Sequence, residues 1–552
     1  MERNLDSLSA TTFDLVVIGG GITGACIARD AALRGLKVAV LEKGDFAHGT
    51  TSGSSKLVHG GLRYLVNGEL ALVRESLRER RIWEEVAPHQ VFPLAFLLPT
   101  YGWGRRSGWY VSLGLWLYDL LSFDRNRVSD PAKRLPGFRS LGRDEAADLV
   151  DGLDPKGLSG AKVYSDCLMP YPERLCLDCL AQAVEHSAAV ANYAEVTGFS
   201  AEPAPDGGYR LTTAKVTDRV SGESLDVRGH MFANAGGPWA DVVLGLAEEG
   251  APPRALVRSK GIHLVTAAKT KDCAAFIQPE GGGHFFVIPW RGHTLFGTTD
   301  EAFDGSPDTA HVSEAEIDAF IATINKGLPG LGLNRDEVLY AYQGLRPLIA
   351  PQESGDGDTY HLSREAEVVD HAVSERIEGL VSALGGKWTT SRAHAQELVD
   401  LVMQKLGRRG RCETARTPLP GGRTGPFEAF VREAEARHAD MPAATVAHLA
   451  SLYGAALDEV IALGREESEG ALLRPLSPER PDIGAQVLYA VRREMARTLE
   501  DVALRRTGIG TLGAPPVAMV EAIADLMAGE LGWSGDERER QIEALNSHYL
   551  YA

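Results

Sequence analysis

A glycine-rich turn near the start of the chain constrains the fold more than any other feature of the sequence. The turn, GGGITG at residues 19–24, follows the apolar run FDLVVI at residues 13–18. An Ala-rich stretch then ends at Gly35, before a second apolar run, KVAVLE at residues 37–42. A glycine suits the left-handed residue that ends a helix, so this order predicts strand, turn, helix and strand. It is typical of the opening of a doubly wound α/β domain.

The same turn predicts a dinucleotide site. Its glycines fit the spacing G-x-G-x-x-G, which lets backbone N–H groups and a helix N-terminus approach a pyrophosphate. An acidic residue at the end of the second strand suits the hydroxyls of a ribose. We therefore expect the cofactor to contact Gly19, Gly20, Gly21, Gly24 and Glu42. This pattern does not distinguish FAD from NAD.

The next segment, TTSGSSKLVHGGLRYL at residues 50–65, is too polar to belong to a core. It concentrates small hydroxyl groups, a lysine, a histidine and glycines, and such a loop fits an extended cofactor. The cofactor contacts expected in this segment are Thr51, Ser52, Ser54, Ser55, Lys56 and His59.

From Ser54 to Leu65 the sequence resembles the FAD-dependent glycerol-3-phosphate dehydrogenases, because the family pattern S-S-K-L-x-H-G-G-L-R-Y-L is present there. Similar stretches continue along the chain: YSDC at 164–167, NAGGPW at 234–239, SKGIH at 259–263, VIPW at 287–290, GTTD at 297–300, GLRP at 344–347, GGKWTT at 385–390 and DVALRRT at 501–507. The resemblance implies FAD as the cofactor, and we expect it to be bound without a covalent bond because no feature of the sequence demands a tether. The resemblance also implies the fold of the D-amino-acid-oxidase-like flavoproteins: a FAD-binding doubly wound, Rossmann-like domain, an antiparallel β cap and a helical C-terminal domain.

The resemblance further implies a substrate, sn-glycerol 3-phosphate, and a product, dihydroxyacetone phosphate. The substrate pocket that it implies consists of Arg63, Tyr64, Arg346, Arg364, Lys387 and Thr389, with Gly386 and Lys387 also at the cofactor. Cationic groups suit this substrate, because a phosphate dianion binds guanidinium forks and ammonium charges. Arg346 lies between apolar residues in YQGLRPL, where an unpaired guanidinium is costly to bury, so we expect an anionic partner there.

The reaction implied by the resemblance transfers a hydride from C2 of the substrate to flavin N5 while the C2 hydroxyl loses a proton. His59 and His263 are candidates for the general base, because imidazole titrates near neutral pH. Arg346 completes the expected catalytic set, and a histidine bonded within the structure is the alternative for His263. A quinone is the expected electron acceptor. An oxidase that uses oxygen and a flavin-bound interaction module without turnover are the alternatives.

The chain is expected to divide into an oxidoreductase region, residues 12–416, and a helical C-terminal domain, residues 427–552. Short alternating runs from about residue 256 predict an antiparallel cap, in which FFVIPW and TLFGTTD form a hairpin. Residues 379–396 return to a strand, a glycine turn and a helix, so the cofactor domain is expected to be discontinuous. The stretch TPLPGGRTGP at residues 417–426 is the predicted linker.

One loop departs from the family pattern. After YSDC, the family's D-A-R-L stretch is replaced here by Pro172, Glu173, Arg174 and Leu175. We expect this loop to border the active site and to influence substrate preference.

Charge and cysteine content argue against several classes of function. The formal net charge is −18, so the overall field repels nucleic acid and we expect no nucleic-acid partner. The six cysteines are scattered, which does not resemble a disulfide framework. Cys176 and Cys179 lack the second pair of ligands that a zinc site needs, so no metal is expected. The N-terminal residues lack the pattern of a secretory signal, which predicts a cytoplasmic protein.

An apolar segment, WYVSLGLWLYDLL at residues 109–121, is shorter than the ~20 residues that span a bilayer. Arginines flank it on both sides, at 105 and 106 and at 125 and 127. The segment therefore predicts a helix that lies in a membrane surface, with peripheral association at the inner face of the cell membrane. A helix buried in the core and a contact in a homodimer are the alternatives.

Overall fold

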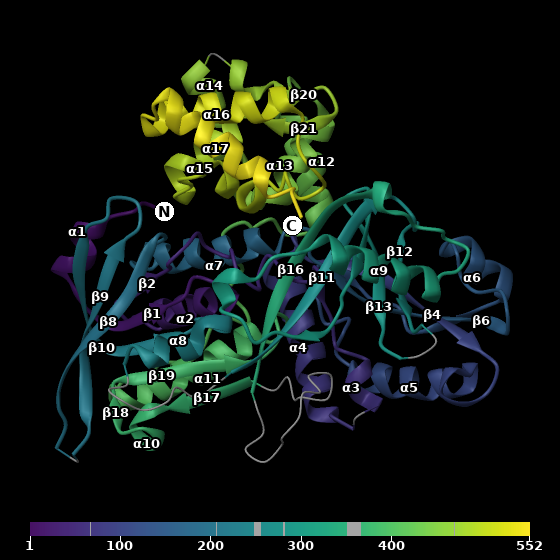
Figure 1. The fold of residues 1–552 in the computed structure, drawn as a ribbon, viewed down its shortest axis with the longest axis horizontal. Helices are drawn as coiled ribbons and strands as arrows, with labels where there is room; N and C mark the ends of the chain where they lie inside the picture. The colour runs from purple at the N-terminus through teal and green to yellow at the C-terminus, as the bar shows by residue number, and fades with distance from the viewer. Residues whose placement is uncertain are drawn as a thin grey trace.

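The computed structural model describes residues 1–66, 68–205, 207–247, 256–279, 282–349, 366–468 and 470–551. Within these residues the chain forms two large sheets, and a helical domain lies against one end of the body that the sheets make (Figure 1). The fold class is the one predicted from the sequence: a doubly wound sheet, a largely antiparallel cap and C-terminal helices.

The first sheet is nine-stranded and begins with the predicted strand, turn, helix and strand. These are β1 (Thr12–Ile18), the glycine turn, α2 (Ile22–Leu33) and β2 (Val38–Leu41). The other strands are β7 (Ala189–Ala191), β8 (Ala194–Pro203), β9 (Tyr209–Asp218), β10 (Ser224–Asn234), β17 (Ala366–Asp370), β18 (Ile377–Glu378) and β19 (Leu380–Gly385). Strands β19, β10, β1, β2 and β7 are parallel neighbours in that order. Because β19 pairs with β10, the chain re-enters this sheet late, as the glycine turn at 379–396 indicates.

Both faces of β1 are buried, which explains why its sequence is an apolar run rather than an alternation. Leu15 and Val17 face a core formed with α2, α7 (Pro172–Glu185) and α11 (Ser391–Lys405). Val16 and Ile18 point the other way and pack against β8 and β9. The sheet is therefore fixed in register by two separate cores.

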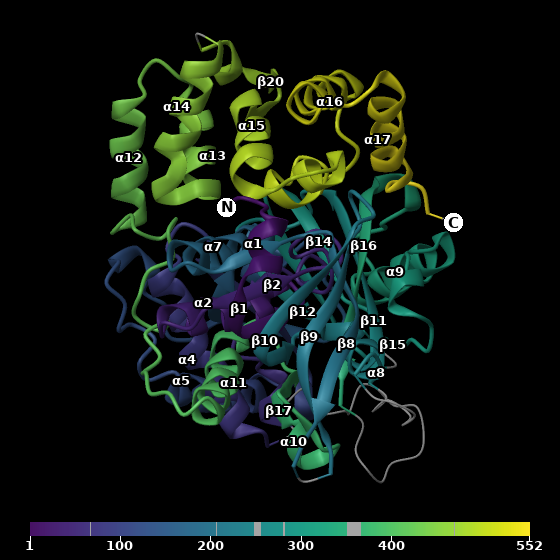
Figure 2. The ribbon, with the colours of Figure 1, turned by 90° about the vertical axis from the view of Figure 1, so that its left-hand side faces the viewer.

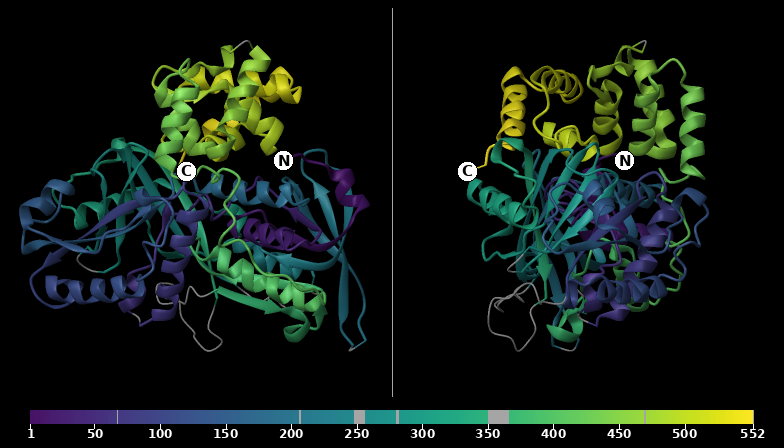
Figure 3. Two further views of the ribbon diagram at one scale, coloured as in Figure 1. Left: turned by 180° about the vertical axis from the view of Figure 1, so that it is seen from behind. Right: turned by 90° about the vertical axis from the view of Figure 1, so that its right-hand side faces the viewer.

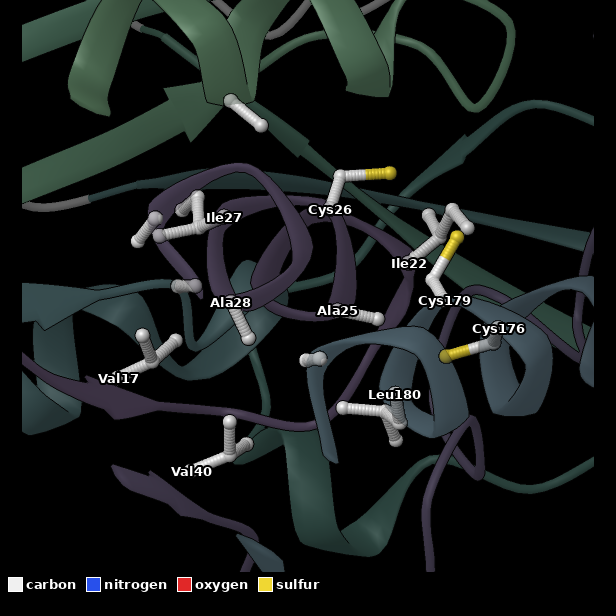
Figure 4. Close-up of a cluster of buried hydrophobic side chains, with 14 of the residues drawn as sticks. Val17, Ile22, Ala25, Cys26, Ile27, Ala28, Val40, Cys176, Cys179 and Leu180 are labelled. Atoms are coloured by element: carbon white, nitrogen blue, oxygen red, sulfur yellow. The ribbon is translucent and has the colours of Figure 1, made fainter. Parts of the chain in front are cut away.

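Buried thiols belong to the first of these cores (Figure 4). Cys26 of α2 and Cys176 and Cys179 of α7 lie where the two helices pack against each other. The six cysteine thiols are free. In the described ranges, no three His, Cys, Asp or Glu side chains gather in a way that could hold a metal ion.

The second sheet is ten-stranded and forms the cap. Its strands are β3 (Leu57–Val58), β4 (Phe92–Tyr101), β5 (Arg139–Leu141), β6 (Leu158–Leu168), β11 (Val257–Ala267), β12 (Cys273–Ile277), β13 (Phe285–Trp290), β14 (His293–Gly297), β15 (Glu301–Ala302) and β16 (Val338–Leu348). Among the described strands of this sheet, neighbours pair antiparallel except β12 and β4, which are parallel. The predicted hairpin is confirmed, since β13 and β14 pair across the turn at Arg291 and Gly292. Contrary to expectation, the cap begins before residue 256, because β3 to β6 belong to it.

Helices cover the cap and fill the space between the two sheets. They are α3 (Arg63–Val66), α4 (Leu70–Val86), α5 (Gly108–Leu121), α6 (Arg143–Leu149) and α9 (Glu314–Gly327). Helix α4 is buried along much of its length, including charged residues. Its Arg80 can be buried because the guanidinium pairs with Asp166 of β6 at 2.5 Å.

The C-terminal helices form a separate layer that packs against the body on the side opposite α5 (Figures 1 and 2). They are α12 (Phe427–Arg437), α13 (Ala443–Tyr453), α14 (Leu457–Ser468), α15 (Gly484–Glu494), the π-helical turn η9 (Asp501–Arg506), α16 (Val517–Leu531) and α17 (Gly535–Ser547), with a small sheet of β20 (Pro475–Ser477) and β21 (Arg480–Ile483). Figure 3 shows this arrangement from behind and from the other side.

Two features of this half of the chain concern its packing. The predicted linker is packed against the body: Leu419 is buried, and its backbone N–H donates to Val86 O at 2.9 Å. By length and composition alone, one helical stretch within the described residues, Ala443–Glu467, would also suffice to cross a membrane. Half of it is buried, and Gly454, at φ +52°, interrupts it between α13 and α14, so it fits the core of the helical domain.

Candidate active site

A large cavity of about 1460 Å³ lies between the two sheets. Ordinary ligand pockets occupy about 300–1,000 Å³, so this one has room for an extended cofactor and a small substrate together. Most of the residues predicted to form the site line it: Gly19, Gly21, Glu42, Thr51, Ser54, Ser55, His59, Arg63, Tyr64, His263, Arg346, Gly386, Lys387 and Thr389.

The glycine turn forms one wall of the cavity. Gly19 has φ +110°, and a Cβ there would lie 2.5 Å from Ala235 O. A Cβ on Gly24 would lie 1.9 Å from Gly19 O, so that glycine allows the helix to pack closely against the turn. Gly21 differs, because a Cβ there would meet only Thr51 Oγ1, at 3.4 Å. The space in front of Gly21 and the N-terminus of α2 is therefore open for an anion.

Glu42 stands at the end of β2 beside this turn. Its carboxylate accepts hydrogen bonds from the backbone N–H groups of Gly20, at 2.6 Å, and Gly44, at 2.8 Å. These bonds fix the carboxylate at the cavity wall, and each oxygen keeps a lone pair for a further donor such as a ribose hydroxyl. Gly20 itself does not line the cavity, since its Cβ position faces Phe46.

The polar loop contributes three hydroxyls to the wall, from Thr51, Ser54 and Ser55. Ser54 Oγ is buried without a hydrogen-bond partner among the residues that the structure describes, and so is Trp388 Nε1 across the cavity. Buried polar atoms in proteins nearly always have a partner. The two atoms therefore fit a ligand that is rich in hydrogen-bonding groups.

Two residues predicted to bind the cofactor are turned away from the cavity. The hydroxyl of Ser52 donates to Ala47 O at 2.8 Å. The ammonium of Lys56 donates to Ser52 O at 2.7 Å and to Glu173 Oε1 at 3.1 Å. Burial lowers the pKa of Lys56, and Glu173 opposes that effect. Both side chains thus hold the loop in shape from behind.

The segment that precedes α11 closes the cavity from the opposite side. Gly385 and Gly386 both have positive φ angles, +65° and +83°, which turn the chain from β19 toward the helix. Thr389 Oγ1 accepts a hydrogen bond from His59 N at 3.2 Å. The two polar segments that were singled out from the sequence are thereby joined.

Cationic side chains from separate segments meet in this cavity. The ammonium of Lys387 lies 4.0 Å from the centre of the Tyr64 ring and donates to Ser76 Oγ at 3.0 Å. The guanidinium of Arg63 lies 5.0 Å from the same ring centre. These positive groups form a local cationic part of the cavity wall, as an anionic substrate requires.

Arg346, on β16, is held firmly in the cavity wall. Its guanidinium donates to Ser259 Oγ at 2.9 Å, Thr298 Oγ1 at 2.8 Å and Thr299 O at 3.0 Å. Asp300 Oδ1 lies 3.7 Å from Nη1, so the expected anionic partner is in part an internal carboxylate. The separation is long for an ion pair, and Arg346 still lines the cavity, where it can bind a second anion.

The two candidate histidines have different surroundings. His263 is buried, stacks on Tyr342 at 4.7 Å, and places Nε2 2.9 Å from Ser55 Oγ. Burial, followed by the charges of Arg346 and Lys56, lowers the pKa of His263 well below its usual range. His263 is therefore neutral at physiological pH and a weak proton acceptor. His59 is half-buried, with its ring 6.3 Å from that of Phe286.

Comparisons with known proteins identify the family. The profile of the FAD dependent oxidoreductases matches residues 14–401, and that of the C-terminal domain of alpha-glycerophosphate oxidase matches residues 412–538. The glycerol-3-phosphate dehydrogenase of Synechocystis is 37% identical over 99% of this chain and 98% of its own length. This chain belongs to the FAD-dependent glycerol-3-phosphate dehydrogenase family. FAD is its cofactor, as predicted.

Two further relatives define the range of the family. The structure of the glycerol-3-phosphate dehydrogenase from Bacillus halodurans complexed with FAD superposes with a TM-score of 0.77, at 29% identity, over 99% of this chain and 96% of that one. The D-erythritol 1-phosphate dehydrogenase of Brucella abortus is 35% identical over 90% of this chain and 94% of its own length. Relatives that are about equally identical to this chain are thus named for two different substrates, glycerol 3-phosphate and D-erythritol 1-phosphate.

For this family member, the wall built by the glycine turn, Glu42 and the polar loop fits FAD, because it offers an open helix N-terminus, a fixed carboxylate and unsatisfied polar atoms. Several lining residues were not assigned from the sequence: Tyr164, Thr298, Thr299 and Asp300 lie within YSDC and GTTD, which matched the family pattern, whereas Gln278 and His284 carried no signal. Arg364 lies outside the described residues. The altered stretch Pro172–Leu175 does not border the cavity, because it forms the buried start of α7.

Proposed function

We propose that the chain oxidises sn-glycerol 3-phosphate to dihydroxyacetone phosphate and passes the electrons to a quinone. The observation that carries this proposal is the meeting of Arg63, Lys387 and Arg346 in the wall of the same cavity as the dinucleotide turn. A guanidinium fork and an ammonium are the groups that bind a phosphate dianion most strongly. The substrate would therefore be held by its phosphate, with the carbon chain directed along the cavity.

FAD would supply the hydride acceptor, flavin N5, for the hydrogen on C2. The residues of this chain would position the substrate and move one proton. His59 would accept the proton of the C2 hydroxyl, since His263 is too weak a base at neutral pH. His263, bonded to Ser55, would instead fix the loop that precedes His59.

Anaerobic titration tests the first half of this proposal. Glycerol 3-phosphate should bleach the flavin absorbance of the purified protein, whereas glycerol, which lacks the phosphate, should do so poorly. D-erythritol 1-phosphate serves as the competing substrate, because a relative of similar identity carries that name. If D-erythritol 1-phosphate half-saturates the bleaching at a lower concentration than glycerol 3-phosphate, the proposed substrate is wrong. If none of the three compounds bleaches the flavin, the result favours an interaction module without turnover.

The proposal of a quinone as electron acceptor rests on the residues that line the cavity near α5. Tyr110, Gly114 and Leu117 of α5 line the cavity, so its wall extends from the dinucleotide turn to this helix. A lipid-soluble acceptor would enter along the helix. After anaerobic bleaching, a quinone analogue should restore the flavin absorbance much faster than air-saturated buffer. The opposite order of rates would identify an oxidase.

Peripheral membrane contact is proposed from the outer face of α5. Trp109, Leu113, Trp116 and Leu120 are 61%, 60%, 59% and 53% exposed, and their spacing places them on one side of the helix. Phe123 and Trp103 extend this apolar face, and Arg105 is exposed beside it. A helix of this kind lies in a membrane interface with its apolar side about 5–10 Å deep. The protein would thus work at the inner face of the cell membrane.

A vesicle flotation assay tests the membrane contact. Trp109→Ser combined with Trp116→Ser should abolish flotation with phospholipid vesicles, while Val517→Ser, which alters an exposed apolar residue of the C-terminal domain, should not. A homodimer formed through α5 is the other outcome. In that case the double variant would shift the sedimentation coefficient from dimer to monomer and leave vesicle binding unchanged.

A further inference from the structure

The loop that follows β2 determines the shape of the cofactor wall. Ala47 N donates to Gly20 O at 3.1 Å, and Ile22 N donates to Thr51 Oγ1 at 3.0 Å. These bonds wrap the loop around the glycine turn and the first residue of α2. A shift of the loop would therefore displace Thr51 and the turn together.

An aspartate in the middle of this loop is held by the C-terminal domain. Asp45 accepts two hydrogen bonds from the guanidinium of Arg506, both at 2.8 Å, one on each carboxylate oxygen. Arg505 Nε adds a third bond, to Oδ2 at 2.6 Å. Asp45 and Arg506 side chains are completely buried. None of the three residues lines the cavity.

Both arginines are themselves fixed by other bonds. Arg506 donates to Glu494 O from Nε, at 3.2 Å, and from Nη2, at 2.9 Å. Arg505 Nη2 donates to Asp501 Oδ1 at 2.6 Å. Asn192, in the turn after β7, donates from Nδ2 to Asp45 Oδ1 at 3.0 Å and to Met495 O at 2.9 Å. The network joins the end of α15 and the turn η9 to the cofactor loop.

We infer that Arg505 and Arg506 are positioning residues for FAD: the C-terminal domain holds the loop around Asp45 in the conformation that binds the dinucleotide. A bidentate guanidinium–carboxylate pair sets both distance and angle, whereas an apolar contact would let the loop slide. The nearby charges of Arg506 and Arg505 also keep the pKa of Asp45 below its usual range despite burial, so the carboxylate stays ionised. The helical domain is thereby part of the cofactor site without touching the cofactor.

A second ion pair across the same domain boundary provides a matched control. Arg174 of α7 pairs with Glu494 at 2.6 Å, and both side chains are nearly as buried as the first pair. The other side-chain contacts of Arg174 within the described residues are with Leu452 O and the Tyr453 ring, and none is with the loop around Asp45. Arg174 binds the side chain of Glu494, whereas Arg506 binds its backbone oxygen, so loss of Arg174 would weaken the domain contact and leave Arg506 and the loop held.

The experiment measures FAD affinity of the full chain without substrate, by quenching of flavin fluorescence as apoprotein is titrated with FAD. Arg506→Met and the milder Arg505→Met should each raise the Kd for FAD at least ~10-fold. Arg506→Lys keeps the positive charge but loses the bidentate guanidinium. Its Kd for FAD should therefore lie between that of the parent and those of the two methionine variants. Arg174→Met should leave the Kd within ~3-fold of the parent while lowering the unfolding midpoint of the apoprotein.

Equal changes in Kd for Arg506→Met and Arg174→Met would overturn the inference, because the pairs would then act only through overall stability. An unchanged Kd for FAD in Arg505→Met would also overturn the inference. If Arg506→Met does not fold, the Kd of Arg505→Met alone tests the inference. Because no substrate is present, an error in the proposed substrate or acceptor does not affect these outcomes.

Discussion

The hydroxyl of Thr389 accepts a hydrogen bond from the backbone N–H of His59, across 3.2 Å. Lys387 lies two residues before Thr389, and Arg63 lies four residues after His59. The bond therefore sets the separation of two cationic side chains that come from distant parts of the sequence. It also places the candidate base, His59, beside the start of α11, in the cavity that both cations line.

Removal of the Arg346 guanidinium should impair binding of the phosphate. Arg346→Ala should lower kcat/KM for glycerol 3-phosphate at least ~100-fold, roughly 2.7 kcal/mol, as expected for one charge-assisted anchor. Glycerol oxidation should decline much less. Steady-state kinetics on both substrates, with the ratio of flavin to protein absorbance measured alongside, make the comparison.

Arg258→Ala is the control for this change. Arg258 lies on the neighbouring strand β11, binds Asp241 and Pro238 O, and does not itself line the cavity. Equal losses for glycerol and glycerol 3-phosphate, or loss of flavin from Arg346→Ala, would mean that Arg346 serves mainly to hold Asp300.

The two histidines should respond differently to substitution. His59→Gln should lower kcat at least ~100-fold and remove the acid limb of the kcat profile, because a general base must be deprotonated to act. The pKa of His263 is already far below neutral, so His263→Gln should leave the pH profile in place and reduce activity less. A profile that loses its acid limb only in His263→Gln would reverse the two roles.

Two glycines of the turn should separate cofactor binding from folding. Gly24→Ala puts a Cβ 1.9 Å from Gly19 O and should lower the unfolding midpoint of the apoprotein. Gly21→Ala meets only Thr51 Oγ1, at 3.4 Å, so the apoprotein should keep its midpoint while FAD affinity falls, because the methyl group occupies the space for the pyrophosphate. Unchanged FAD affinity in Gly21→Ala would place the pyrophosphate elsewhere. Thermal unfolding and flavin titration of both variants suffice.

The C-terminal tail should confer a pH-dependent part of the stability. Burial lowers the pKa of His548 to about 4, and its Nε2 lies 2.9 Å from the Tyr340 hydroxyl. In the unfolded chain a histidine has a pKa of about 6.5, so below that pH the unfolded chain binds more protons than the folded one. This contribution is complete above pH ~6.5 and is lost progressively as the pH falls to about 4.

The variant His548→Gln should lack this part of the pH dependence. The difference in unfolding midpoint between parent and variant should shrink from pH 7 to pH 4.5, because carboxylates that titrate in both proteins cancel. A difference that does not change with pH would mean that His548 titrates normally in the folded protein.

Local sequence patterns were sufficient to predict the elements that depend on the spacing of neighbouring residues. The turn from Gly19 to Gly24, the hairpin around Arg291 and the return of the chain near Gly385 each follow from residue spacing and glycine chemistry. The cap strands β3 to β6 were missed, because they join the later cap strands only through the pairing of β4 with β12, at Ala95 and Cys273, and such long-range pairing leaves no mark on a single strand.

For the candidate site, the sequence predicted which residue types gather there better than it predicted which side chains point into the cavity. Lys56 stands in a polar loop, and nothing in the sequence shows that its ammonium turns inward to Glu173. Asp300 was not predicted as a site residue for a similar reason, because only the folded strands bring its carboxylate within 3.7 Å of the Arg346 guanidinium. The pairing of Asp45 with Arg506 could not be inferred at all, because neither residue has a neighbour that suggests the other.

The cavity that joins Gly19 to Thr389 also limits when the protein can acquire its flavin. At ~5–20 residues per second, a ribosome needs about 20 to 75 s to synthesise the chain between these two residues. Until then the dinucleotide turn exists without its opposite wall, and β10 lacks its neighbour β19. Flavin loading is thus a late event in the life of the nascent chain, and a product cut short before Thr389 would be released colourless.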